Sequence, residues 1–173
     1  MFQNIIFLGG IHGAGKGTLC SKVKEVLDIE HFSASELLRW TEVNADPKNK
    51  LVTDIPSMQD RLILGLHQRV EPNRKYLLDG HFCLFDSQGK LEYVPFDTFS
   101  QIDPILISVL TAEPETILQR LTERDGKAYD IQLIRQMQEE EINYGKWVAG
   151  KLNKPFLVME EDEQILIDAI NKI

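Results

Sequence analysis

A glycine-rich segment near the start of the chain most strongly limits what the chain can fold into. The apolar run Ile5-Ile6-Phe7-Leu8 leads directly into Gly9-Gly10-Ile11-His12-Gly13-Ala14-Gly15-Lys16-Gly17-Thr18, and a helical pattern follows. A strand, a glycine loop with a lysine and a helix, in that order, form a phosphate-binding loop, or P-loop. Its glycines let consecutive backbone N–H groups point at phosphate oxygens, and the helix adds its own unpaired N–H groups.

Eight residues of this loop are predicted to bind the phosphates of ATP. They are Gly10, His12, Gly13, Ala14, Gly15, Lys16, Gly17 and Thr18. Lys16 would place a full positive charge near the β- and γ-phosphates. Gly17 follows the lysine where Ser or Thr is usual, so the hydroxyl of Thr18 is displaced by one position. For His12 two interpretations are open, a contact with a phosphate and an exposed loop histidine.

The length and charge of the chain narrow the possible classes of protein. Its 173 residues, 43% of them apolar, are enough for one domain with a buried core, so we expect a single domain over residues 1–173. The net charge of −8 argues against a general nucleic-acid-binding protein, which needs a basic surface. A small anionic ligand is still compatible, because a local cluster of Lys and Arg can outweigh the global sign.

Neither a leader nor a membrane segment is predicted. The apolar start has no basic stretch before it, and no apolar run approaches the ~20 residues that cross a bilayer. Cys20 and Cys83 lie far apart in the sequence and form no metal-binding spacing. We expect both to be reduced, partly buried thiols of a cytoplasmic protein.

Apolar strands alternate with helical patterns along the chain. Strands are predicted at about 3–9, 29–32, 76–79, 104–110 and 156–159. Helices are predicted at about 15–27, 34–42, 56–70, 96–102, 114–123, 129–152 and 162–172, with a loop at 44–55 and a turn at 86–89 that fits a small hairpin. Short apolar strands separated by helices indicate a parallel sheet covered on both faces. The predicted fold is therefore α/β, a three-layer P-loop NTPase fold with a five-stranded parallel sheet and helices on both faces.

The strand at 76–79 ends in an acidic residue, Asp79. An apolar strand that ends in aspartate is typical of a Walker-B segment, whose carboxylate holds a water on Mg²⁺ at the carboxyl end of the sheet. Thr18 and Asp79 are the predicted metal contacts, either directly or through water. The expected cofactor is Mg²⁺, with ATP as co-substrate.

Two patterns resemble the P-loop nucleoside monophosphate kinases, and the adenylate kinases in particular. The order Gly15-Lys16-Gly17-Thr18 looks like the adenylate kinase form of the loop. The stretch 31–39 is similar to that family's second strand and AMP-site helix: it keeps His31, Ser33, Leu38 and Arg39 and departs from the family at Ala34, Ser35 and Glu36. The resemblance implies that Arg39 binds the acceptor phosphate, for which a guanidinium fork is well shaped. An exposed helix arginine is the alternative.

The run Asp79-Gly80-His81 looks closer to the archaeal-type and nuclear-type adenylate kinases than to the common branch, in which a proline and an arginine follow. By this resemblance the acceptor phosphate has one cation fewer than in the common branch. His81 is a candidate to fill part of that role, and a structural histidine after a strand is the alternative.

A short lid is expected at about residues 120–130. A helix ends there, and Arg120, Arg124 and Lys127 fall within eight residues. Phosphoryl transfer needs positive charge over the transferred group and exclusion of water. Arg120 and Arg124 are four residues apart and share one helix face, although a solvated, charged helix end would look the same. Farther along, Glu139-Glu140-Glu141 is interpreted as a solvated helix face and not as a metal site.

The sequence thus predicts an enzyme, a P-loop nucleotide kinase that transfers a phosphoryl group from ATP to a nucleoside monophosphate. Its catalytic residues are predicted to be Lys16, Asp79, Arg120 and Arg124. Two alternatives are open: a kinase for another small metabolite, with Asp79 or His81 as the base for an alcohol acceptor, and a nucleotide-dependent regulatory ATPase. The expected partners are small-molecule nucleotides, with no nucleic acid and no membrane, and a protein partner is left open.

Overall fold

The computed structural model of the protein describes residues 2–43, 58–85 and 90–173. The predicted loop at 44–55, the predicted helix start at Pro56 and the predicted turn at 86–89 lie outside the described residues.

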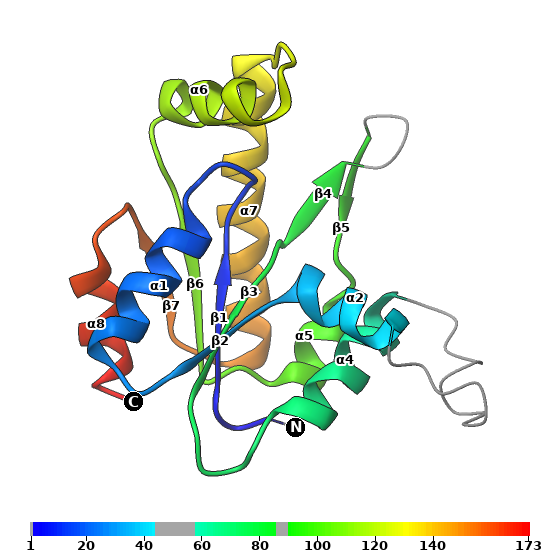
Figure 1. Cartoon of the computed structure of the whole chain (residues 1–173), viewed down its shortest axis with the longest axis vertical. Helices are drawn as coiled ribbons and strands as arrows, with labels where there is room; N and C mark the ends of the chain where they lie inside the picture. The colour runs from blue at the N-terminus through cyan, green and yellow to red at the C-terminus, as the bar shows by residue number, and fades with distance from the viewer. Residues whose placement is uncertain (1, 44–57, 86–89) are drawn as a thin grey trace.

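Five parallel strands form the central sheet (Figure 1). Their bounds are Ile5–Gly9 for β1, Glu30–Ser33 for β2, Tyr76–Asp79 for β3, Leu106–Leu110 for β6 and Phe156–Met159 for β7. Their order across the sheet is β2-β3-β1-β6-β7, and the central strand β1 is buried along its whole length. Because the strands are parallel, the loop after β1 and the acidic end of β3 meet at the same edge of the sheet.

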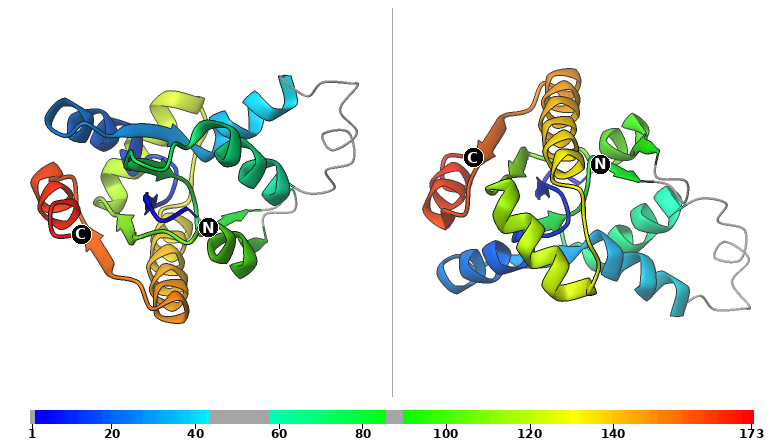
Figure 2. Two further views of the ribbon diagram at one scale, coloured as in Figure 1. Left: turned by 90° about the horizontal axis from the view of Figure 1, so that it is seen from below. Right: turned by 90° about the horizontal axis from the view of Figure 1, so that it is seen from above.

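Helices cover both faces of this sheet. In the described residues they are α1 (Lys16–Val26), α2 (Ala34–Val43), α4 (Met58–Arg69), α5 (Phe96–Ile102), α6 (Pro114–Asp125), α7 (Ile131–Leu152) and α8 (Glu163–Ile170). Alternate residues of β1 point to opposite faces. Ile6 and Leu8 join an apolar cluster with α1 and α8, which lie side by side in Figure 2, whereas Ile5 and Phe7 join a second cluster with α4, α5 and α7. The predicted three-layer α/β fold is confirmed, and the predicted ends of its elements that fall in the described residues differ by at most two residues.

A small antiparallel hairpin lies outside the main sheet. Its strands are β4 (Cys83–Phe85) and β5 (Leu91–Tyr93), which Figure 1 shows beside α7. These two strands flank the turn predicted at 86–89, so the predicted hairpin is confirmed in its paired strands.

Helix α7 approaches the sheet closely at Gly145. A Cβ atom on Gly145 would lie 3.0 Å from Cε2 of Phe82 and 3.1 Å from Cγ2 of Val109, tighter than ordinary van der Waals contact. The ring of Phe82 is fully buried and stacks on Phe99, with 5.0 Å between their centroids. This close approach places the preceding turn of α7, with Glu141, over the carboxyl end of β1.

Candidate functional site

The loop after β1 has the backbone that a P-loop requires. Gly15, the residue before α1, has a φ of 98°, in the left-handed region that favours glycine. Gly10 has a φ of 140°, and a Cβ there would lie 2.6 Å from the carbonyl oxygen of Leu110. Any larger side chain at these two positions would therefore strain the loop. The N–H of Gly10 donates a hydrogen bond to the carboxylate of Glu141, so a side chain from another element fixes the loop at this residue.

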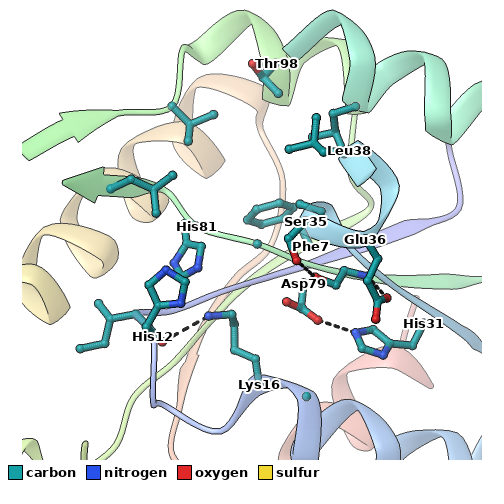
Figure 3. Close-up of a pocket in the computed structure, with 18 of the residues that line it drawn as sticks. Phe7, His12, Lys16, His31, Ser35, Glu36, Leu38, Asp79, His81 and Thr98 are labelled. Carbon is teal, nitrogen blue, oxygen red and sulfur yellow. Dashed lines mark hydrogen bonds and ion pairs between the residues drawn. The ribbon is translucent and has the colours of Figure 1, made fainter. Parts of the chain in front are cut away.

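The side chain of Lys16 lies inside the curl of the loop and is 8% exposed. Its Nζ donates to the carbonyl oxygens of Gly10, at 2.5 Å, and Ile11, at 3.2 Å. Figure 3 shows the ammonium group of Lys16 pointing back toward the loop at His12. Burial lowers the pKa of Lys16, and the nearby carboxylates of Glu141 and Asp79 oppose that shift. The loop thus holds a buried ammonium group at the position where nucleotide phosphates bind in this motif.

The carboxylate at the end of β3 is held by a histidine from the neighbouring strand. The register of β2 on β3 pairs Ser33 with Asp79, which brings His31 to the same edge. Nε2 of His31 and Oδ2 of Asp79 are 2.5 Å apart, and both side chains line the same cavity as Lys16 (Figure 3). This contact, which we did not predict from the sequence, orients Asp79.

Asp79 shares its cavity with one hydroxyl and lies near two softer potential metal ligands. Thr18, which also lines the cavity, offers a hydroxyl, and oxygen ligands are those that Mg²⁺ prefers. Cys20 and His31 offer softer atoms within 4.8 Å of the Asp79 carboxylate. The thiol of Cys20 is fully buried, and burial raises its pKa to about 12, so this sulfur stays protonated at neutral pH and is a poor metal ligand. Both cysteines are free and fully buried, more deeply than predicted.

A cavity of about 820 Å³ runs from this edge toward α2, α4, α5 and the hairpin. Its phosphate end is lined by the P-loop, Lys16 and Asp79. Its far end is lined mainly by apolar side chains, which include Leu38, Leu62, Leu84, Val94 and Phe99. The cavity therefore has a polar, charged end and an apolar end, the composition expected of a site for an organic phosphate and a second small ligand.

Of the two residues predicted to contact the phosphoryl acceptor, one lines the cavity and the other is not among its described lining residues. Arg39 is exposed on α2 and is not among the described residues that line the cavity. His81 lines the cavity, and its ring packs against that of His12 with 4.2 Å between centroids. Burial, with the charge of Lys16, lowers the pKa of His81 to about 2. Its imidazole is thus neutral at physiological pH. It can form a hydrogen bond with a ligand in the cavity, but it carries no positive charge.

The two predicted lid arginines also differ in whether they line the cavity. Arg120 of α6 donates to the carbonyl oxygen of Gly13, at 3.2 Å, pairs with Glu161, and lines the cavity. Arg124 forms a bidentate pair with Asp125, at 2.6 and 2.7 Å, and is not among the described lining residues. The structure thus brings Arg120 to the phosphate end and leaves Arg124 one helical turn away.

The interpretation of 139–141 as a solvated face is wrong for Glu141. This side chain is fully buried, and its carboxylate accepts hydrogen bonds from three backbone N–H groups. The periodicity of α7 contains the missing signal: Glu141 is seven residues after buried Ile134, four before buried Gly145 and seven before buried Val148. It therefore belongs to the apolar face of the helix, whereas Glu139 is exposed.

Comparisons with known proteins identify the family. Residues 9–143, most of the chain, match the model of an AAA domain family. The chain belongs to this family. Probable UMP-CMP kinase 2 of Arabidopsis thaliana is 28% identical over 161 residues, which cover 88% of this chain and 58% of the relative. Adenylate kinase isoenzyme 1 of Bos taurus is 27% identical over 131 residues, which cover 69% of this chain and 63% of the relative. The chain thus spans about three fifths of the length of these two relatives.

A match to adenylate kinase isoenzyme 1 of Cyprinus carpio extends farther, with 26% identity over 98% of this chain and 95% of the relative. The predicted resemblance to nucleoside monophosphate kinases is confirmed by these matches.

Solved structures support the fold. A gluconokinase from Sinorhizobium meliloti 1021 aligns with a TM-score of 0.51 and 13% identity over 96% of this chain and 89% of its own. An uncharacterized protein from Eubacterium ventriosum ATCC 27560 aligns with a TM-score of 0.52 and 17% identity over 98% of this chain and 97% of its own. Among the described residues, none of the helices combines the length and the hydropathy that a membrane crossing requires.

Proposed function

We propose that the protein is a kinase that transfers the γ-phosphoryl group of ATP to a small acceptor, and that a nucleoside monophosphate is the first candidate acceptor. One observation carries the proposal: the P-loop, Lys16 and Asp79 converge on one end of a cavity whose other end is apolar. The nucleotide kinases among the relatives support the same reaction class.

Each residue at the phosphate end has a role that its chemistry suits. The loop N–H groups and Lys16 would stabilise the negative charge that spreads over the transferring phosphoryl group. Arg120 would add a second cation after exchanging Glu161 for a phosphate oxygen. We propose that residues 120–130 act as the lid that carries Arg120 and Arg124 and excludes water.

Thr18 and Asp79 provide a hydroxyl and a carboxylate that fit Mg²⁺, and they would hold the ion directly or through water. When bound, Mg²⁺ supplies neutralising charge to the β- and γ-phosphates. His31 fixes the carboxylate of Asp79 through its hydrogen bond, so that the orientation of Asp79 does not depend on the ion. A phosphate acceptor is already anionic at pH 7 and needs no strong general base.

A second candidate is a kinase for a metabolite with a hydroxyl acceptor. The exposure of Arg39 and the apolar far end of the cavity favour it, because among the described lining residues the lysine and arginine side chains, Lys16 and Arg120, lie at the phosphate end. An alcohol would need a base, for which Asp79 and His81, which both line the cavity, are the candidates.

A panel of nucleoside monophosphates and small alcohols, each with ATP and Mg²⁺, tests the proposal by the rate of ADP formation. Fast ADP formation with one acceptor supports a kinase and identifies the acceptor class. Slow ADP formation that no acceptor accelerates contradicts both candidates and favours a regulatory ATPase. Lys16→Ala is the control, since it should abolish acceptor-dependent turnover while circular dichroism stays unchanged.

Arg39→Ala then separates the two acceptor classes. If Arg39 binds the acceptor phosphate, the acceptor KM should rise roughly 10- to 150-fold, the effect of losing a charged hydrogen-bond partner, while the ATP KM stays the same. Arg39→Lys should rescue only part of the loss, because an ammonium lacks the fork. An unchanged acceptor KM in Arg39→Ala would favour the metabolite kinase.

A further inference from the structure

Glu141 is a fully buried carboxylate that joins three separate parts of the fold. It belongs to α7, far along the chain from the P-loop, and lies over the carboxyl end of the central strand β1. A carboxylate without solvent contact is costly to bury, so native proteins retain one only when its oxygens are well hydrogen-bonded.

Both oxygens of Glu141 accept backbone donors. Oε2 accepts the N–H of Gly10, at 2.8 Å, in the phosphate loop. Oε1 accepts the N–H groups of Phe82, at 2.8 Å, and Cys83, at 3.0 Å, in the segment that follows Asp79. A single side chain thus ties the P-loop to the segment after the Walker-B strand, and it fixes both to the long helix α7.

The same carboxylate lies close to two polar groups of the site. Nδ1 of His81 is 3.8 Å from Oε1 of Glu141. The ammonium of Lys16, which donates to the carbonyl oxygen of Gly10, is near enough for its charge to interact with Glu141. Glu141 therefore accepts a hydrogen bond from the N–H of Gly10, and the carbonyl oxygen of the same residue accepts one from the ammonium group of Lys16.

We propose that Glu141 is a positioning residue for phosphate binding: it sets the conformation of the P-loop at Gly10 and, through Phe82 and Cys83, the direction in which the chain leaves Asp79. This inference rests on the proposed nucleotide binding, and it adds a residue that touches no substrate. An amide cannot replace the carboxylate, because its NH₂ group would face a backbone donor, either Gly10 on one side or the Phe82–Cys83 pair on the other.

Calorimetric titration of Glu141→Gln with ADP and with inorganic tripolyphosphate tests the proposal. The matched control is Glu139→Gln, the same chemical change on an exposed position of the same helix. At a temperature where both variants are fully folded, Glu141→Gln should bind both ligands at least ~10-fold more weakly, and Glu139→Gln should bind like the wild type. Equal losses for both ligands are expected because the loop contacts the phosphates and not the base. Wild-type affinity in folded Glu141→Gln would overturn the proposal.

Amide hydrogen exchange gives a second readout that needs no ligand. In Glu141→Gln the amides of Gly10, Phe82 and Cys83 should exchange faster while the strands of the core keep their protection. Unchanged protection at these three amides would also overturn the proposal. If the wild type binds neither ADP nor tripolyphosphate, the proposed function fails, and the exchange result still decides the role of Glu141.

Should Glu141→Gln not fold, Glu141→Asp replaces it in both experiments, since it keeps the charge and is one methylene shorter. It should show a smaller loss of affinity and faster exchange at Gly10, and wild-type behaviour in both measurements would overturn the proposal.

Discussion

His81 should make the stability of the protein fall at mildly acidic pH. Its side chain is 16% exposed, and burial, Lys16 and His12 together lower its pKa from 6.5 to about 2. In the unfolded chain the ring regains its ordinary pKa. Between pH 6.5 and about 2 the unfolded state therefore binds a proton that the folded state does not, so the free energy of unfolding decreases as the pH falls through this window.

The size of the effect follows from the difference between the two pKa values. At pH 7.5 the ring is neutral in both states and contributes almost nothing. At pH 5.5, one unit below the unfolded pKa, protonation of the unfolded chain costs the folded state about 1.4 kcal/mol. That is a large share of the roughly 5–15 kcal/mol by which domains are usually stable.

Urea denaturation of the wild type and of His81→Gln, at pH 7.5, 6.5 and 5.5, measures the contribution. This range stays above the pI of about 5.0, where the protein has no net charge to keep it soluble. His12 is present in both proteins and packs on His81, so the difference between their pH dependences measures the contribution of His81 together with its coupling to His12. The wild type should lose about 1.4 kcal/mol more than His81→Gln between pH 7.5 and 5.5. Parallel pH dependences would refute the assignment of a neutral, buried His81.

Three further predictions address the metal contact, the packing of α7 and the thiols. Asp79→Asn should lower kcat at least ~100-fold in a coupled ADP assay and change the melting temperature little, because it removes a charge and keeps the shape; equal losses of activity and stability would indicate a structural role. Gly145→Ala should lower the free energy of unfolding, measured by urea denaturation, by about 1–3 kcal/mol, because the added Cβ would lie 3.0 Å from the ring of Phe82. Gly150→Ala on the same helix is the control: its Cβ would have open space around it, so it should raise the free energy of unfolding by about 0.5–1 kcal/mol. Cys20 and Cys83 should react with a thiol reagent at pH 8 only after unfolding, because both are fully buried and burial raises the pKa of each thiol; rapid labelling of the native protein would contradict that burial.

Local sequence patterns were sufficient to predict most of the fold. The strand at 5–9 and the strand at 76–79 are short apolar runs bounded by a glycine loop and an acidic residue, and such signals depend on few neighbours. The P-loop was predictable for the same reason, because its strand, glycines and helix are contiguous. The position of Asp79 at the same edge as Lys16 then follows from parallel strands alone.

Contacts that depend on register or on packing between distant segments could not be predicted. The hydrogen bond between His31 and Asp79 exists because β2 pairs with β3 in one particular register, which neither strand determines by itself. The burial of Glu141 requires the close approach of α7 to the sheet at Gly145. Phe82 and Cys83, whose N–H groups donate to Glu141, lie some 60 residues earlier in the chain. Read in isolation, three consecutive glutamates on a helix look solvated, and only the partners across the fold reverse that interpretation.

The two ends of the cavity also differ in how far apart their lining residues are in the sequence. For this reason a binding site for a phosphoryl acceptor is harder to predict from the sequence than a binding site for nucleotide phosphates. The phosphate end is built largely from one contiguous loop, whereas the apolar end combines side chains such as Leu38, Leu62, Leu84 and Phe99 from four separate elements. Leu62 and Phe99 also belong to the apolar core, so the same atoms support the fold and form the wall of the cavity. A leucine or phenylalanine at such a position has the same sequence pattern whether it faces a ligand or another side chain. In the proposed kinase, the packing of α2, α4, α5 and the hairpin would therefore determine which acceptors fit the apolar end.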